Sequence, residues 1–513
     1  MILPISLKQT LPVFLRYPNL LALAAGGITT LAYAPFNVWI MALAGPAVLF
    51  VLWLERPHLC VKTGFVYGLG LMGSGVSWLH VSIAQFGDLG WLFPLVVTLV
   101  FIVLMALYYA CLGWLAGRFR TTRSQSLILL YPALWVLLEW LRGWFLTGFP
   151  WLQIGYSQID SPLAGYGPLL GVLGISWMVL VTTGLLLSLT TPTRYRLGYL
   201  SAAVLIWVAG WMGARIDWSQ PIGAPIRVAL IQGNIPQAEK WLPEQLLPSL
   251  VLYANKTKEN FDRDLIVWPE TAVSAFQFQV DDAFIRPLEN TVKKHQTHLV
   301  FGVVQMDQER KHYFNAMVAL GNEERDHYYK RHLVPFTEYL PLKGILWPLV
   351  DLFTIPMSDF STREEAKPIM RVGDYLAGLS ICYEDAFGSE MIEALPEAAF
   401  LINASNDAWF GKSLAPYQHL QIARMRALET GRYLLRSTNT GISAIIGPGG
   451  DILAASPLLE VDVLKGEILP LEGVTPFAKY GNLSVLALML LTIIAGFPCR
   501  YSILGDRCGR SRE

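Results

Sequence analysis

The sequence has few charged residues and no excess of either sign. Only 15% of its 513 residues are Asp, Glu, Lys or Arg, and 39 acidic residues balance 39 basic ones. A soluble globular domain carries about 25% charged residues, so this composition excludes an ordinary soluble protein. The balance of charge also gives no indication of nucleic-acid binding. Because 53% of the residues are hydrophobic, the composition predicts a lipid bilayer as the main partner.

Cysteine is scarce as well, which excludes a disulfide framework. Of the five cysteines, Cys60 and Cys111 lie in or beside apolar runs, and Cys499 and Cys508 lie near the C-terminus. Cys382 is therefore alone in the long polar region, where no disulfide within the domain is possible. In an oxidising compartment an exposed lone thiol would be oxidised. Cys382 is therefore expected to be either buried or used in a reaction.

Long apolar runs are abundant, and the composition changes sharply near residue 220. The runs lie at 18–34, 38–54, 62–80, 91–115, 126–144, 163–189, 197–213 and 481–498. They predict eight membrane spans, and the small residues of the third run would let helices pack closely. We therefore expect a membrane domain over 1–219, a globular catalytic domain over 220–475, and an eighth span with a tail over 476–513.

The distribution of Lys and Arg predicts the orientation of these spans. The loops 35–37, 81–90 and 145–162 contain neither residue, whereas the alternate connections and the C-terminal tail do. The positive-inside bias then assigns both termini to the cytoplasm and the globular domain to the outer side. The triplet 32–34 imitates a signal-peptidase site, but Pro35 opposes cleavage, so we expect the first run to remain as a span.

Strand and helix patterns alternate in the polar region. Strands are predicted at 226–232, 264–268, 299–304, 314–320, 375–381, 399–403, 433–437 and 442–446, and helices at 243–261, 283–296 and 413–430. This alternation predicts a layered α/β core with polar residues at the strand ends.

Three residues at such strand ends have complementary chemistry. Cys382 follows the apolar run YLAGLSI, Glu270 follows LIVWP, and Lys330 lies in YYKRHLVPF. A nucleophilic thiol needs a base to accept its proton and a cation to stabilise the oxyanion that forms. Separately, the three would fit a packed cysteine, a helix cap and a solvated lysine. Together they predict covalent acyl chemistry.

Four segments carry a resemblance to a known family. WPET at 268–271, YYKRHLVPFTEYLP at 328–341, ICYED at 381–385 and NASNDAWFG at 403–411 resemble signatures of the nitrilase superfamily and, within it, of the bacterial apolipoprotein N-acyltransferase family. The likeness extends over essentially the whole chain. It implies an αββα sandwich in the periplasm, attached to the bacterial inner membrane. It also implies transfer of a fatty acyl chain from a phospholipid, typically phosphatidylethanolamine, to the N-terminal amine of a diacylglyceryl-cysteine lipoprotein.

The resemblance also implies roles for individual residues. Glu270 would be the general base, Lys330 the oxyanion cation, and Cys382 the nucleophile that becomes an acyl-thioester. Supporting roles are implied for Glu338, Tyr383 and Glu384, and substrate contacts are expected for Trp241, Asn406 and Trp409. Thr337 departs from the glycine that the family usually has before this glutamate, and a β-branched residue disfavours positive φ. We therefore expect the Glu338 loop to differ in shape.

Two further segments carry expectations about the membrane. Residues 340–353, with Trp347, are apolar but too short to span, and we interpret them as an arm that dips into the outer leaflet and contacts substrate; an ordinary packed helix is the alternative. Glu139 and Arg142 lie three residues apart at the end of a span, where they are expected either to pair or simply to anchor the interface. His332 and His419 lack a ligand-like cluster, so we interpret both as structural and expect no metal or cofactor.

Three classes of function remain open. The first is the acyltransferase. The second is a membrane-tethered carbon-nitrogen amidohydrolase that uses the same Glu270, Lys330 and Cys382 with water as the acceptor. The third is a transporter or lipid-binding scaffold without catalysis, which the many spans favour but which does not explain the three reactive residues.

Overall fold

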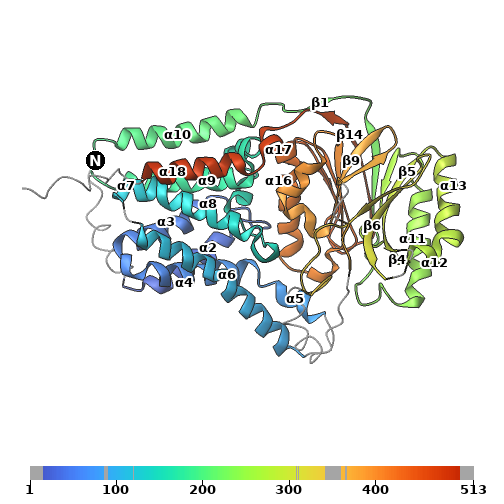
Figure 1. Ribbon diagram of the computed structural model, residues 1–513, viewed down its shortest axis with the longest axis horizontal. Helices are drawn as coiled ribbons and strands as arrows, with labels where there is room; N and C mark the ends of the chain where they lie inside the picture. The colour runs from blue at the N-terminus through green and yellow to red at the C-terminus, as the bar shows by residue number, and fades with distance from the viewer. Residues whose placement is uncertain are drawn as a thin grey trace, which may run out of the picture.

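The computed structural model describes residues 16–496 apart from 86–89, 120, 308, 310, 341–359 and 364–366. A group of helices and a layered α/β part lie side by side (Figure 1). Trp347 and residues 341–353 of the expected arm lie outside the described residues, so the arm stays a prediction.

Each of the eight apolar runs overlaps a helix. These are α2 Pro18–Thr30, α3 Met41–Glu55, α4 Cys60–Gly75, α6 Leu92–Arg118, α8 Tyr131–Arg142, α9 Gly167–Ser188, α10 Arg196–Gly213 and α18 Leu483–Gly496. Among the described residues, four helical stretches are long and apolar enough to cross a membrane: Leu92–Arg118, Arg123–Arg142, Pro162–Ser188 and Arg196–Gly213. The other apolar helices are shorter, so the full set of eight spans stays a prediction.

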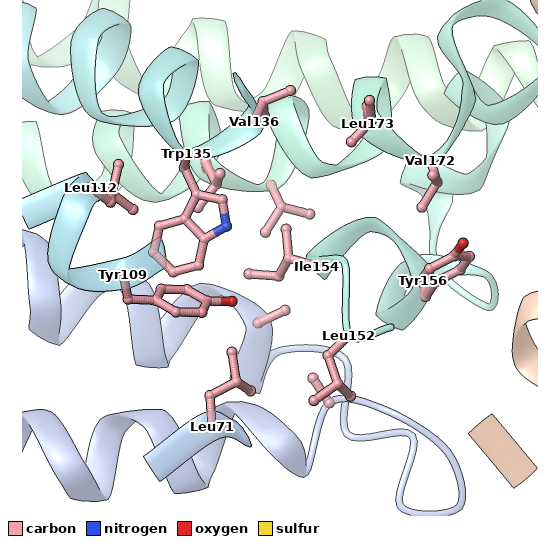
Figure 2. Close-up of a cluster of buried hydrophobic side chains, with 14 of the residues drawn as sticks. Leu71, Tyr109, Leu112, Trp135, Val136, Leu152, Ile154, Tyr156, Val172 and Leu173 are labelled. Carbon is pink, nitrogen blue, oxygen red and sulfur yellow. The ribbon is translucent and has the colours of Figure 1, made fainter. Parts of the chain in front are cut away.

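Glycine lets neighbouring helices of this part approach closely. A Cβ atom on Gly26 of α2 would lie 2.1 Å from the carbonyl oxygen of Tyr67 on α4, and one on Gly64 of α4 would lie 2.2 Å from that of Tyr109 on α6. Large aromatic rings fill the remaining space, as Figure 2 shows for Tyr109 and Trp135, whose ring centroids are 5.5 Å apart. This is the close packing that small residues allow between membrane helices.

The layered part contains two main sheets. One has the strand order β13 Ile452–Ala455, β12 Ala444–Ile446, β11 Leu434–Thr438, β10 Phe400–Ser405, β9 Tyr375–Ile381 and β8 Ile369–Val372. The other has the order β14 Asp462–Ile468, β2 Ile226–Gln232, β3 Leu265–Val267, β5 His298–Met306, β6 Tyr313–Leu320 and β7 Asp326–Tyr329, with β4 Val273–Phe276 also paired to β5. A short pair, β1 Gln220–Pro221 with β15 Leu471–Glu472, joins the places where the chain enters and leaves this part.

Apolar side chains of the two sheets meet in one core, which includes Val267 and Met317 from one sheet and Leu379 and Ile402 from the other. Helices α11 Pro243–Lys258 and α13 Arg286–Lys294 cover the outer face of the sheet that contains β2, β3, β5 and β6. Helix α16 Ala415–Thr430 covers the other outer face and lies between the sheets and the helical part (Figure 1). The predicted α–β–β–α layering is thus confirmed.

The predicted positions of the interior elements are also confirmed. Each of the eight expected strands overlaps an observed strand, and the three expected helices correspond to α11, α13 and α16. Short helices that the sequence did not predict are α5 Leu79–Ala84, α7 Arg123–Gln125, α12 Gln277–Val280, α15 Gly388–Met391 and α17 Pro476–Tyr480.

Candidate active site

Three strand ends bring the predicted reactive residues to one edge of the sandwich. Glu270 follows β3 after a Trp-Pro pair, Lys330 directly follows β7, and Cys382 directly follows β9. Strand β3 is parallel to β5, and β7 is antiparallel to β6, which is itself antiparallel to β5. Strands β3 and β7 therefore point the same way, so their carboxyl ends lie at the same edge of their sheet.

Lys330 lies between two carboxylates. Its Nζ donates to Glu338 Oε1 at 2.8 Å and to Glu270 Oε1 at 3.4 Å. The Asn315 side chain on β6 donates to the same Glu270 oxygen at 2.6 Å. Lys330 is 1% exposed; burial lowers its pKa, but the charges of Glu338 and Glu270 outweigh burial and raise it above the ordinary value. Lys330 is therefore a fixed cation.

Cys382 is the first residue of a short 3-10 helix, Cys382–Ala386, that directly follows β9. Its φ is +53°, in the left-handed region that non-glycine residues rarely adopt and that often marks functional positions. Burial and the negative charge of Glu270 raise the pKa of this half-buried thiol, while the charge of Lys330 lowers it. The resting thiol is therefore protonated, and a base must accept its proton when it attacks.

Glu384 joins the strand end that carries Cys382 to the segment that carries Lys330. Its Oε2 accepts from the Ile381 amide at 2.6 Å and from the Tyr328 hydroxyl at 2.8 Å. Its Oε1 accepts from the Arg331 amide at 2.6 Å and from the His332 amide. These four hydrogen bonds let Glu384 connect the two sheets at the site. Its supporting role in the reaction stays a prediction.

The Glu338 loop is not disturbed by Thr337 in the way the sequence suggested. The residue with positive φ in this loop is Phe336, at +65°, and not Thr337. The Thr337 hydroxyl donates to the Val334 carbonyl at 3.2 Å, and the Val334 amide donates to Glu338 Oε2 at 2.8 Å. The β-branched residue is therefore accommodated, and Glu338 still reaches Lys330.

Three of the residues expected to contact substrate are described by the structure. Trp241 is 50% exposed. The Asn406 amide bonds to Gln237 and Asn439, so it holds the surrounding loops. The carbonyl of Trp409 accepts from the side chain of Gln85 at 3.1 Å. Their contacts with substrate stay predictions.

Tyr383 extends from the site toward the helical part. Its hydroxyl donates to the Gly148 carbonyl at 3.1 Å, and its ring stacks on Trp151 at 6.3 Å. The side chain of Gln418 on α16 accepts from the indoles of Trp78 and Trp151 and donates to the Gly75 carbonyl. The edge of the sandwich that carries Cys382 therefore rests on the apolar helices.

A buried group of four charged residues lies behind the Cys382 turn, and sequence reasoning missed it. Arg436 pairs with Asp385 at 3.1 Å and with Asp407 at 2.9 Å. His419 bonds to the same two carboxylates, at 2.9 and 3.0 Å. Burial and Arg436 lower the pKa of His419, but Asp385 and Asp407 outweigh them and raise it to about 9. His419 is thus a charged structural residue, and no group suited to a metal ion occurs among the described residues.

Asn315 and Lys240 were also missed. Asn315 had a signal in the sequence, because it is a polar residue inside the otherwise apolar run FNAMVAL. Lys240, beside Trp241, had no such signal. The expected pair of Glu139 and Arg142 does not form, although both are described; Glu139 instead accepts from the Trp135 indole, the Ile154 amide and the Ser176 hydroxyl.

Comparisons with known proteins identify two regions of the chain. Residues 227–476 match the carbon-nitrogen hydrolase family, in agreement with the two-sheet α/β architecture of this part. The chain is also similar to the solved carbon-nitrogen hydrolase of Helicobacter pylori G27, with 17% sequence identity and a TM-score of 0.37 over 48% of this chain and 89% of that one. Residues 25–185 match the N-terminal domain of apolipoprotein N-acyltransferase.

Whole-length relatives specify the family further. The chain is 43% identical to an apolipoprotein N-acyltransferase of Methylococcus capsulatus, over 96% of this chain and 98% of that protein. It is 39% identical to one of Photobacterium profundum, over 90% and 91% of the two chains. The chain belongs to the apolipoprotein N-acyltransferase family, whose members are acyltransferases.

Proposed function

We propose that this chain transfers a fatty acyl group from a phospholipid, with phosphatidylethanolamine as the typical donor, to the N-terminal amine of a diacylglyceryl-cysteine lipoprotein. The observation that carries the proposal is the backbone turn at Cys382, where φ is positive, together with the buried ion pair of Lys330 and Glu270 at the neighbouring strand ends. In this proposal the eight apolar helices span the bacterial inner membrane, both termini are cytoplasmic, and the catalytic domain is periplasmic.

The first half-reaction forms a thioester. Glu270 accepts the thiol proton as the Cys382 sulfur attacks the ester carbonyl, and the oxyanion forms beside the Lys330 ammonium. The carbon–oxygen bond then breaks, and Glu270 returns the proton to the departing alkoxide of the lysophospholipid. The fixed charge of Lys330, held by Glu338, stabilises the oxyanion without reorganisation.

The second half-reaction forms an amide. The lipoprotein amine attacks the thioester carbonyl and Glu270 accepts the amine proton. The carbon–sulfur bond then breaks, and Glu270 passes this proton to the departing sulfur, which restores the thiol of Cys382 and the carboxylate of Glu270. The donor product leaves before the acceptor reacts, so the kinetics are ping-pong. Water would hydrolyse the thioester, which favours a site that rests against apolar helices.

The proposal is tested by trapping the intermediate. The full chain in vesicles with acyl-labelled phosphatidylethanolamine should gain a base-labile acyl group on Cys382, which a diacylglyceryl lipopeptide then removes. Cys382→Ala should lose the label, while Cys111→Ala, which removes an exposed thiol among the apolar helices, should keep it. Free fatty acid without labelled lipopeptide would indicate the amidohydrolase class instead. Labelled lipopeptide formed by Cys382→Ala would exclude the thioester.

A further inference from the structure

The loop 233–242, between β2 and α11, contacts residues that follow strands of both sheets. Its first part is bound to the end of β11: the Asn234 amide donates to the Asn439 carbonyl at 2.8 Å, and the Ile235 amide donates to Asn439 Oδ1 at 3.0 Å. Its last part carries Trp241, which is half exposed, and Lys240, which is 2% exposed. A buried ammonium ion at this position has a large desolvation cost, so its contacts call for an explanation.

Lys240 bonds to the turn that carries Glu270. Its Nζ donates to the Glu270 carbonyl oxygen at 3.1 Å and to the Thr271 hydroxyl at 2.5 Å. Among the described residues it forms no ion pair with a carboxylate. The turn itself is strained, because Thr271 has a φ of +46°. It also lies tightly on β5, where a Cβ atom on Gly302 would be 2.3 Å from the Thr271 nitrogen. Strained turns of this kind persist only where surrounding contacts hold them.

The site has an excess of negative charge that a second cation would balance. Lys330 contacts two carboxylates, Glu270 and Glu338, so these three groups together carry one net negative charge when all are ionised. Loss of the Cys382 proton, followed by formation of the oxyanion, places further negative charge beside them. Such charge is costly in a buried site unless a positive charge lies near.

We propose that Lys240 is a positioning residue of the thioester-forming step: it holds the strained turn that presents Glu270, and its charge balances the negative charge that develops at Cys382. This inference rests on the function proposed above. It assigns to Lys240 a role distinct from that of Lys330, because Lys240 bonds to backbone and hydroxyl oxygens and acts on the reacting atoms through Glu270 and through its charge.

The electrostatics of Lys240 give the proposal a measurable signature. The titratable groups that face its ammonium are Glu270, on the turn after β3, and Cys382, at the end of β9; both raise its pKa, but burial outweighs them and lowers it to about 8. Lys240 is therefore charged at neutral pH and loses its charge as the pH rises past about 8. The rate of thioester formation should fall over the same range.

The test measures single-turnover acylation of Cys382 by labelled phosphatidylethanolamine from pH 6 to 10, with the full chain in vesicles. The wild-type rate should fall above pH 8. Lys240→Met should be roughly 100-fold slower at pH 7, as expected for a misplaced reacting group, and should lack that fall. Lys240→Arg, which stays charged, should recover part of the rate and also lack the fall. Lys294→Met, which removes an exposed lysine of α13, is the matched control and should behave like the wild type.

Each outcome separates the two proposals. A wild type that forms no thioester contradicts the proposed function. A wild type that forms the thioester with no fall in rate near pH 8 contradicts the role of Lys240, and so does Lys240→Met with an unchanged rate. A slow Lys240→Met that keeps the wild-type pH profile would mean that the residue is only structural. If Lys240→Met does not fold, the wild-type and Lys240→Arg profiles still decide.

Discussion

The two parts of the molecule bury different kinds of groups. In the helical part, the described buried side chains are mostly aromatic, aliphatic or small, and Glu139 and Arg142 are its buried charges. The layered part buries many charged groups around the site, including Lys330, Asp385 and Arg436. Charge is therefore concentrated where the chemistry is proposed, and close backbone contact is concentrated where the helices meet.

The difference follows from what stabilises each part. Helices surrounded by lipid gain little from burying apolar area, so close approach at glycine and satisfied polar groups hold them together. A two-sheet core in water gains about 25 cal/mol for each Å² of buried apolar surface. That gain offsets the desolvation of charges, provided that each charge has its partner.

Removing one member of the buried charge group should have the largest effect on stability. Arg436→Met leaves Asp385 and Asp407 buried with one cation fewer, so we expect the layered part to lose about 3–5 kcal/mol. The measurement is chemical unfolding of the full chain in detergent. Arg227→Met, which removes a pair with Asp264 that is about half exposed, should cost much less, because solvent screens this pair. Similar losses for the two variants would mean that burial does not distinguish these ion pairs.

The same group should make stability depend on pH. The pKa of His419 is raised in the folded state to about 9 from an ordinary 6.5, so its contribution is fully present below pH 6.5 and is lost as the pH rises through 9. The loss is on the order of 3 kcal/mol for a shift of this size. In the wild type the free energy of unfolding should fall between pH 6.5 and 9, and in His419→Gln this fall should be much smaller. The described histidines of the helical part, His58 and His80, are exposed, so replacing either should leave the slope unchanged.

A smaller effect is expected where two helices touch through glycine. Gly26→Ala would place a Cβ atom 2.1 Å from the Tyr67 carbonyl oxygen, so α2 and α4 must separate, at a cost of about 1–3 kcal/mol. The adjacent Gly27 has open space around it, so Gly27→Ala should be neutral or stabilise the helix by up to about 1 kcal/mol. Thermal unfolding in detergent compares the two. Equal effects of the two substitutions would show that close approach does not hold these helices.

The sequence predicts the interior of the fold better than its edges. The eight predicted strands are all present, whereas the strands at the four sheet edges, β13, β8, β14 and β7, were not predicted. An edge strand is covered less and carries more polar residues, as the largely exposed β13 and the segment DHYY of β7 show. Hydrophobic periodicity, which depends on burial, is therefore weak at these positions.

For the site, the sequence indicates residue types at strand ends but not the contacts that depend on topology. Glu270 and Lys330 were predicted from their places at strand ends and Glu338 from the family resemblance, and hydrogen bonds from Lys330 join the three residues. Their roles stay predictions. Lys240 reaches the Glu270 turn only because β2 lies beside β3 in the sheet. Asn315 reaches Glu270 only because β6 lies between β5 and β7. Neither neighbour relation is visible before the strand order is known.

The smallest effect is expected at Thr337, where the chain departs from the usual glycine. Because Phe336 and not Thr337 has the positive φ, Thr337→Gly relieves no strain and removes one hydrogen bond to the Val334 carbonyl. We expect acylation of Cys382 to change less than about tenfold, since a single such hydrogen bond contributes about 1 kcal/mol. Glu338→Gln, in contrast, removes a charge that holds Lys330 and should slow the same step by much more. If Thr337→Gly accelerated acylation as strongly as Glu338→Gln slowed it, the threonine would be a constraint on this loop that its backbone angles do not reveal.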